Sequence, residues 1–157
     1  MTQMIVPRVV KENQDLDRVR GRRCFANCKK TIFQLSFAVY LAAVLFLCFG
    51  HFDNTPSVPL SFLGIPTDKI VHFCMFFPFP ILAFLAFDKY TETPWSSVLF
   101  TGITWVVGLL LAAGTEWGQA ELTDYRSGDL WDLVADVIAI TLSSLLVLYW
   151  DIHKQKR

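Results

Sequence analysis

The chain has 157 residues, of which 54% are hydrophobic and 15% aromatic, and its basic and acidic residues balance at 14 each. This length allows one domain, and the apolar share exceeds what a soluble domain normally carries. The apolar residues are clustered along the sequence, which indicates a membrane protein and excludes a single large soluble core. We expect no nucleic-acid partner and no cofactor.

Residues 1–30 form a basic arm. The arm is polar and lacks sustained periodicity, so the sequence predicts a segment that is at least partly disordered. Its basic residues are Arg8, Lys11, Arg18, Arg20, Arg22, Arg23, Lys29 and Lys30. Such a run is expected to orient the first span in the membrane. It also suits contact with anionic headgroups of the inner leaflet, at roughly 1 kcal/mol for each basic residue.

Four segments after the arm are long and apolar enough to cross a hydrocarbon core of roughly 30 Å, which takes about 20 helical residues. In chain order they cover residues 32–49, 70–87, 96–115 and 130–150. The predicted fold is therefore an all-α membrane protein. A bundle of four transmembrane helices fills residues 31–150, and residues 151–157 form a basic tail.

The charges of the two ends predict the topology. Basic residues next to membrane helices stay on the cytoplasmic side, and four spans return the chain to the side where it started. Both termini are therefore predicted to be cytoplasmic. The loops at residues 62–67 and 117–129 then lie outside, and the turn at residues 89–94 lies inside.

Particular residues predict local features within the spans. Pro78 and Pro80 each remove a backbone donor, so a bend is expected in the second span. Gly108 and Ala112 form a small-xxx-small pair that allows close helix packing. Asp129 is a suitable N-cap for the fourth span.

A set of polar residues flanks or interrupts the spans at their outer end, and ionisable groups at membrane depth usually mark a functional site. The set is Asp68, Lys69, His72, Glu116, Gln119, Arg126, Asp132 and Asp136. At 1.5 Å of rise per residue, Asp136 lies about 9 Å and His72 about 6 Å inside the outer boundary of the core. We therefore predict that His72, Glu116, Arg126 and Asp132 converge on one pocket, with Asp136 as its floor.

Asp136 is the most informative member, because a lone carboxylate at that depth would cost several kcal/mol or take up a proton. Its expected partner is Arg126, Lys69 or His72. The competing interpretation is an interhelical salt-bridge network that fixes the register of the bundle.

Three short patterns in this region resemble a known family. Asp68-Lys69-x-x-His72 opens the second span, Glu116-x-x-Gln119 closes the third, and Arg126 is followed six residues later by Asp132. In this order they resemble the VanZ-like family of small membrane proteins, named for a teicoplanin-resistance protein. The resemblance covers roughly residues 68–146.

The family pattern usually has asparagine at the position of Asp136. The resemblance implies a bacterial cytoplasmic membrane and a link to the cell envelope or to glycopeptide resistance.

The leading functional hypothesis is that the outer end binds or handles an anionic or glycosylated amphiphile of the membrane. Lys69 and Arg126 suit a phosphate or carboxylate, with bidentate geometry for arginine. Glu116, Gln119 and Asp132 suit hydrogen bonds to sugar or peptide groups. The bent second span would give acyl chains lateral access.

Two other classes stay open. An intramembrane enzyme would use His72 and Glu116 as base and acid, with Asp132 as a further candidate, and it would need an activated water or a carboxylate nucleophile. A metal-assisted version would use His72 with Glu116, Asp132 or Asp136. Lys69 and Arg126 sit among the same groups and would repel a cation, so no metal site is predicted. The third class is a scaffold without a small ligand.

Overall fold

The structure of the protein is a computed structural model. It describes residues 5–50, 61–62, 65–87, 91–122 and 129–156, with the side chains of residues 5–19, 21–26, 61, 62, 65 and 122 undefined.

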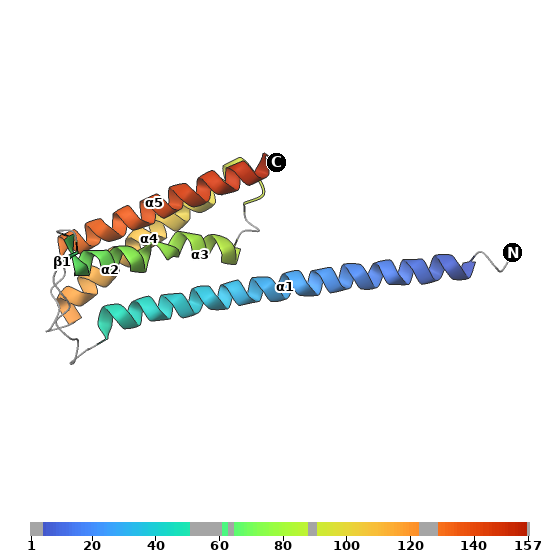
Figure 1. The fold of residues 1–157 in the computed structure, drawn as a ribbon, viewed down its shortest axis with the longest axis horizontal. Coiled ribbons are helices and arrows are strands. Elements are labelled where there is room, and N and C mark those ends of the chain that lie inside the picture. Colours follow the sequence, from blue (N-terminus) through green and yellow to red (C-terminus); the bar gives the residue numbers. More distant parts are fainter. Residues whose placement is uncertain (1–4, 51–60, 63–64, 88–90, 123–128, 157) are drawn as a thin grey trace.

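Helices dominate the described chain, and four of its helical segments are apolar and long enough to cross a membrane. The elements are α1 Ile5–Phe49, β1 Ser61–Phe62, β2 Ile65–Pro66, α2 Thr67–Phe76, α3 Pro78–Phe87, α4 Pro94–Leu122 and α5 Leu130–Gln155 (Figure 1). The apolar stretches are Asn27–Phe49, Thr67–Phe87, Pro94–Glu121 and Leu130–Gln155. The prediction of an all-α, four-span integral membrane protein is confirmed.

Helix α1 corrects the expectation of a partly disordered arm. It runs without a break from Ile5 through the apolar span to Phe49, and the basic half extends beyond the bundle (Figure 1). The arm contains many good helix formers, and Pro7 falls in the first turn, where proline is tolerated. Propagation from the apolar span adds one hydrogen bond per residue, so weak periodicity does not prevent helix formation.

The second span is divided at Phe77, immediately before Pro78 as the sequence predicted. Helix α2 ends at Phe76 and α3 begins at Pro78. Two further boundaries differ from expectation. Trp117, expected in the outer loop, lies in α4, which continues past Gly118 to Leu122 because no proline interrupts residues 116–122. The segment before α2, expected as an outer loop, contains a two-residue antiparallel ladder between β1 and β2.

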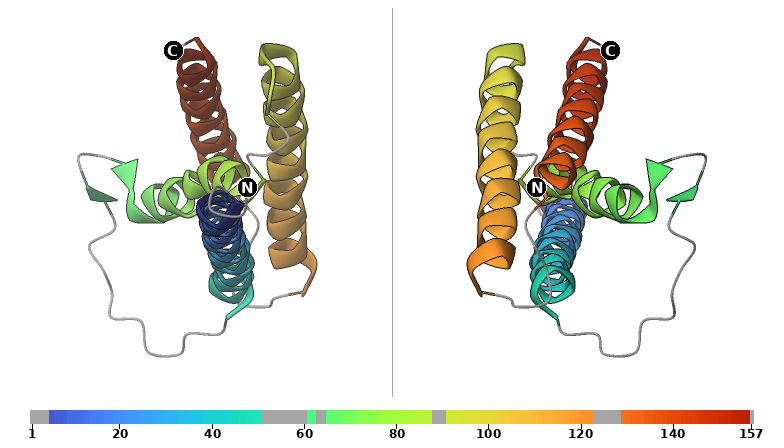
Figure 2. Two further views of the ribbon diagram at one scale, coloured as in Figure 1. Left: turned by 90° about the vertical axis from the view of Figure 1, so that its right-hand side faces the viewer. Right: turned by 90° about the vertical axis from the view of Figure 1, so that its left-hand side faces the viewer.

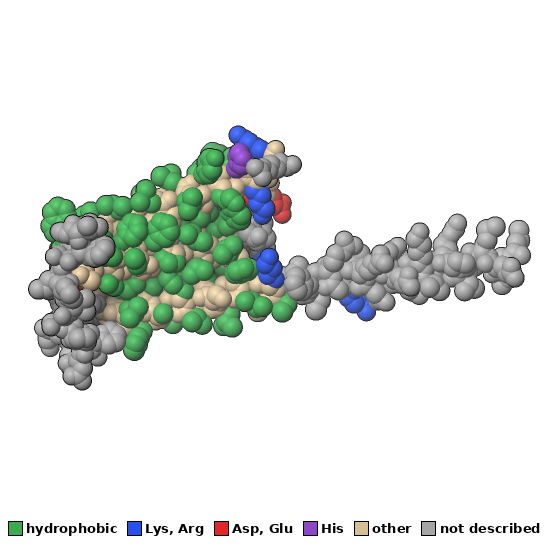
Figure 3. All heavy atoms as spheres, in the orientation of Figure 1, with side chains coloured by type: hydrophobic (Ala, Val, Ile, Leu, Met, Phe, Trp, Pro, Cys, Tyr) green, Lys and Arg blue, Asp and Glu red, His purple; other side chains and the backbone are tan. Residues whose placement is uncertain are grey.

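Helix α5 shows how the bundle is packed. Its buried residues recur every three or four positions and form one inward stripe: Asp132, Asp136, Ala139, Ile140, Ser143, Ser144, Val147 and Asp151. Large apolar residues such as Leu142, Leu145 and Tyr149 are exposed instead. Polar groups inside and apolar groups outside are the arrangement expected of a helix surrounded by lipid. The flank seen in Figure 3 is covered by hydrophobic side chains.

The helices pack around α5, which contacts α2, α3 and α4, while α1 packs mainly on α3. Helices α4 and α5 run side by side (Figure 2). The helices pack closely at Gly108, where a Cβ atom would come within 3.1 Å of side-chain atoms of Ile140 and Phe79. The predicted close packing at Gly108 and Ala112 is confirmed, since Ala112 is fully buried. The extension of α1 and the C terminus lie at one end of the bundle (Figure 1).

Candidate functional site

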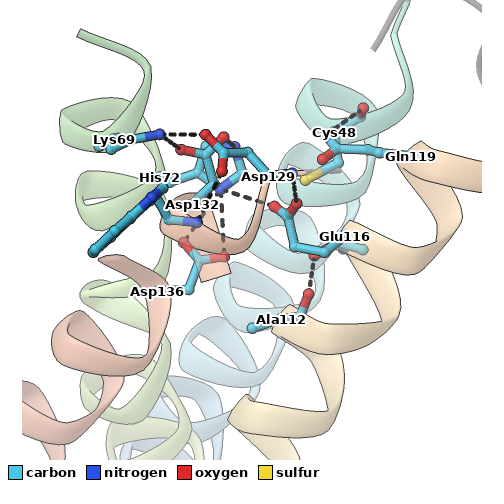
Figure 4. Close-up of polar contacts among 11 residues, drawn as sticks. Cys48, Lys69, His72, Ala112, Glu116, Gln119, Asp129, Asp132 and Asp136 are labelled. Carbon is cyan, nitrogen blue, oxygen red and sulfur yellow. Dashed lines mark hydrogen bonds and ion pairs between the residues drawn. The ribbon is translucent and has the colours of Figure 1, made fainter. Parts of the chain in front are cut away.

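The opposite end of the bundle holds a compact group of ionisable side chains, which we name the His72 cluster. The cluster consists of Lys69, His72, Glu116, Asp129, Asp132 and Asp136. The start of α2 contributes Lys69 and His72, the end of α4 contributes Glu116, and the start of α5 contributes the aspartates (Figure 4). Three spans therefore meet at one polar layer, as the helical rise predicted.

Lys69 occupies the rim of the cluster. Its Nζ donates to Asp129 Oδ2 at 2.7 Å and to Asp132 Oδ1 at 2.8 Å. Both distances are those of charge-assisted hydrogen bonds. The lysine side chain is 21% exposed and that of Asp132 only 6%. The bridge ties α2 to α5, and it leaves Lys69 already shared between two carboxylates.

Asp129 joins the three helices. Its side chain caps α5 by accepting from the Trp131 amide at 3.0 Å, as predicted. Its own backbone N–H donates to Glu116 Oε2 at 3.1 Å. The hydrogen bond from Lys69, aided by the one from the Trp131 amide, lowers the pKa of the Asp129 carboxyl below its usual range.

His72 lies among three carboxylates. Its Nδ1 is 3.5 Å from Glu116 Oε1 and 3.3 Å from each carboxylate oxygen of Asp136, while Nε2 is 4.0 Å from Asp132 Oδ2. All four residues are at most 7% exposed, and Asp136 is fully buried. Of the expected candidates that the structure describes, His72 is thus the partner of Asp136.

Two carboxylate oxygens inside the cluster have no hydrogen-bond donor among the described residues. They are Glu116 Oε1 and Asp136 Oδ1, and both face His72 Nδ1. A buried acceptor without a donor costs about 1–3 kcal/mol, and more when it is charged. Such groups are retained where a ligand, an ion or a proton completes them.

The remaining predicted site residues are placed differently. Gln119 is buried, but its side chain contacts the first span, where its Nε2 donates to the Cys48 carbonyl at 3.0 Å. Asp68 is exposed at the start of α2, although one of its carboxylate oxygens lies within 4.8 Å of ligand atoms of His72 and Asp132. Arg126 lies outside the described residues. The convergence predicted for His72, Glu116, Asp132 and Asp136 is present.

Sequence reasoning missed two features. It used Asp129 only as a cap, whereas Asp129 also pairs with Lys69, a link that its position one turn before Asp132 could have suggested. It also missed a second polar group at the other end of the bundle, which we name the Asp151 cluster (Ser97, Asp151 and Gln155). There Ser97 Oγ donates to Asp151 Oδ2 at 2.6 Å, and Gln155 Nε2 donates to Ser97 Oγ at 2.7 Å.

Among the described residues, acidic groups outnumber basic ones in the His72 cluster, with four carboxylates, one lysine and one histidine. Even with His72 protonated, four negative charges would face two positive ones. An apolar surrounding disfavours such an imbalance strongly. The cluster is therefore suited to binding hydrogen-bond donors, amines, protons or metal ions.

Comparisons with known proteins give little about function. No family profile matches the chain, and no solved structure matches it. A protein of Schizosaccharomyces pombe described as uncharacterized protein C11E3.10 is 29% identical over 114 residues, which cover 72% of this chain. The aligned part spans 62% of that yeast protein. The resemblance to the VanZ-like family stays a prediction carried by the three motifs.

Proposed function

We propose that this membrane protein binds the polar head of an amphiphile at the His72 cluster, and that the head is glycosylated or otherwise rich in hydroxyl or amine donors. The single observation that supports the proposal most is the acid excess of a buried cluster that still has acceptors to fill. Carboxylates accept hydrogen bonds strongly from hydroxyl and ammonium groups.

Of the two ligands suggested by the sequence, the same geometry favours a glycosylated amphiphile over an anionic one. An anionic head would need a cation with free hydrogen-bonding capacity. Among the described residues that cation is Lys69, which already donates to Asp129 and Asp132 at 2.7 and 2.8 Å, so an incoming phosphate would find one remaining N–H donor beside two carboxylates that repel it. Sugar hydroxyls can instead donate to these carboxylates while the lysine bridge stays intact.

Access to the cluster is expected from the membrane–water interface. Asp68 is exposed, the side chain of Asp129 is 42% exposed and that of Lys69 is 21% exposed, so these three residues form an open rim. An apolar groove lined by Trp105 and Thr141 lies on the seam between α4 and α5. Gly108 packs against Ile140 between this groove and the His72 cluster, so the seam does not offer the amphiphile a lateral route to the cluster. The amphiphile would place its head at the rim and its chains along the outer flank.

The proposed orientation places both ends of the chain in the cytoplasm and the His72 cluster in the opposite leaflet. The basic arm would then lie near anionic inner-leaflet headgroups. A role in a bacterial cell envelope, or in teicoplanin resistance, would follow from the VanZ-like resemblance. Because the chain is similar to a yeast protein, the proposal of amphiphile binding is not restricted to bacterial membranes and applies to any membrane with a cytoplasmic face.

A structural role is the second candidate, and the Lys69 bridge between α2 and α5 favours it. Networks of this kind fix the register of helices. The two unpaired oxygens favour ligand binding over a purely structural role, because a structural network gains no stability from acceptors that lack donors. Ligand binding and stability must therefore be measured on the same variants.

The test uses nanodiscs of phosphatidylcholine doped either with a glucosyl diacylglycerol or with phosphatidylglycerol. We expect the protein to retain the glucosyl lipid preferentially on extraction, measured by native mass spectrometry. Asp132→Asn should weaken retention by about 1.5–3 kcal/mol, the scale of a charge-assisted hydrogen bond. Asp151→Asn, the same change at the opposite end, should leave it unchanged. Equal retention of both lipids, or full retention in folded Asp132→Asn and His72→Ala, would refute the proposal.

A further inference from the structure

We infer that His72, Glu116 and Asp136 form a binding site for one divalent transition-metal ion, with Zn²⁺ as the first candidate. This inference does not depend on amphiphile binding. One nitrogen or oxygen atom from each residue lies within 4.8 Å of the others, and all three residues are buried.

The distances inside the group fit a metal better than they fit direct ion pairs. Charge-assisted hydrogen bonds measure about 2.7–2.9 Å between heavy atoms. The contacts of His72 Nδ1 are longer, at 3.5 Å to Glu116 Oε1 and 3.3 Å to Asp136 Oδ1. Ligand bonds of about 2.1 Å at tetrahedral angles place neighbouring ligand atoms about 3.4 Å apart. The two distances from His72 Nδ1 thus match those between ligands of one ion, and the ligand atoms of all three residues lie within 4.8 Å of one another.

The two unpaired oxygens are the second observation. Glu116 Oε1 and Asp136 Oδ1 belong to residues that are 7% and 0% exposed, and both are directed at His72 Nδ1. A divalent cation between them would coordinate both oxygens. It would also neutralise two carboxylates with a neutral imidazole, which a position inside the bilayer requires.

Neighbouring groups contact His72 and Glu116 in the way that hydrogen-bond partners usually orient metal ligands. The Asp129 amide occupies Glu116 Oε2 and so directs Oε1 inward. His72 Nε2 faces Asp132 Oδ2 at 4.0 Å, the side on which ligating histidines normally meet a carboxylate. A shift of about 1 Å would bring this pair into hydrogen-bond range.

Lys69 does not oppose a cation at this position, contrary to the expectation from sequence. Its ammonium group is bound to Asp129 and Asp132 at the rim, and those two carboxylates neutralise it. The exposed Asp68 lies with His72 and Asp132 in a second group of closely spaced ligand atoms. That group leads from the surface towards the buried site and offers the entry path that a metal site needs.

The imidazole ligand excludes Ca²⁺ and Mg²⁺ as the preferred ions, because these select all-oxygen sites. One nitrogen and two carboxylate oxygens suit Zn²⁺, Mn²⁺ or Fe²⁺. Three protein ligands are also the number found in zinc sites that keep one position open.

The experiment uses the full chain, purified with a removable tag that contains no histidine, in a detergent whose head carries neither sugar nor carboxylate. After chelator treatment the protein is reloaded with Zn²⁺, Mn²⁺ or Co²⁺, and bound metal is measured by elemental mass spectrometry. We expect one tightly bound ion per chain. Co²⁺ loading should give the visible absorption of a four-coordinate site.

Glu116→Gln and Asp136→Asn keep the shape of the side chain, and each should lower Zn²⁺ affinity by at least about 100-fold, more than loss of an outer partner does. His72→Ala should abolish stoichiometric binding, and Asp132→Asn should weaken it by about 10–100-fold. Asp151→Asn, which alters a buried aspartate at the opposite end, should bind as the wild type does.

The site does not exist if the wild-type protein binds no stoichiometric metal, or if folded His72→Ala retains its metal. Equal losses in Asp136→Asn and Asp151→Asn would also overturn the inference, because a general loss of folding would then explain both. A monodisperse elution profile establishes folding for each variant. The amphiphile proposal is tested with lipid alone, so the two can fail separately.

Discussion

The two ends of the bundle each bury an aspartate on α5, but they satisfy it in different ways. Asp151 accepts from two neutral donors, Ser97 Oγ at 2.6 Å and Gln155 Nε2 at 3.2 Å. Asp136 instead faces His72 at 3.3 Å, beside the unpaired Oε1 of Glu116. The atom left over in the Asp151 cluster is Gln155 Oε1, a neutral amide oxygen.

The difference supports the proposal that the Asp151 cluster is structural and the His72 cluster binds a ligand. In the Asp151 cluster the Gln155 amide also donates to the Thr91 carbonyl at 2.9 Å, so the contacts close the turn before α4 onto the end of α5. In the His72 cluster the strong bonds lie at the rim, and the interior keeps acceptors that lack donors. Strain of this kind is expected where binding is selected over stability.

The largest expected effect concerns which end faces outward. Single cysteines at Ser57 and Asp124, in a chain without its four native cysteines, should react with an impermeant thiol reagent added to intact cells. A cysteine at Gln155 should react only after permeabilisation. The expected difference is all-or-none because the proposed orientation, which follows the positive-inside rule, keeps both basic ends in the cytoplasm. The reverse pattern would move the His72 cluster to the cytoplasmic leaflet.

Removing the rim lysine should be the most damaging single change to stability. In Lys69→Met, Asp132 keeps its buried position but loses its cation. Breaking a buried pair costs about 3–5 kcal/mol, and the partial exposure of Lys69 reduces our expectation to about 2–3 kcal/mol. Steric-trap unfolding in bicelles measures the loss.

Lys154→Met is the control for that change at the opposite end, where Lys154 lies 5.6 Å from the Trp150 ring in an exposed contact. It should cost no more than about 1 kcal/mol. Equal losses in the two lysine variants would remove the distinction between the ends.

The packing between the two ends gives a smaller effect. In Gly108→Ala the new Cβ would lie 3.1 Å from Ile140 and Phe79 side-chain atoms, so these side chains or α4 must give way by a few tenths of an ångström. We expect a loss of about 1 kcal/mol in the same unfolding assay. Gly114→Ala meets nothing within 4 Å and should be neutral or stabilise α4 by up to about 1 kcal/mol.

Metal binding should survive Gly108→Ala, because the altered contact lies two turns from Glu116. A gain of stability in this variant would show that the helices are less closely packed than the distances indicate.

Hydropathy was sufficient to predict the four spans, because each requires about 20 apolar residues whatever its neighbours are. Helical rise was sufficient to place His72, Glu116 and Asp136 in one layer. The pairing within that layer could not be predicted, because the rotation of each helix decides whether Lys69 meets Asp136 or Asp129. Inter-helix packing sets that rotation, and single-chain periodicity does not report it.

The helical arm and the Asp151 cluster could not be predicted from the sequence, for two other reasons. Residues before the first span carry no amphipathic pattern, so their helix depends on propagation from the span. Ser97 and Gln155 are ordinary interfacial residues in isolation. They become partners of Asp151 only because the start of α4 lies beside the end of α5.

The most direct test of the distinction compares Asp136→Asn with Asp151→Asn in metal-free protein, by their free energies of unfolding. Asp151→Asn should lose about 0.5–1.5 kcal/mol, because charge-assisted bonds to Ser97 and Gln155 become neutral ones. Asp136→Asn should be at least as stable as the wild type, since it removes a buried charge and restores the residue typical of the VanZ-like pattern. A loss at Asp136 equal to or larger than that at Asp151 would contradict the account and make the His72 cluster a structural network.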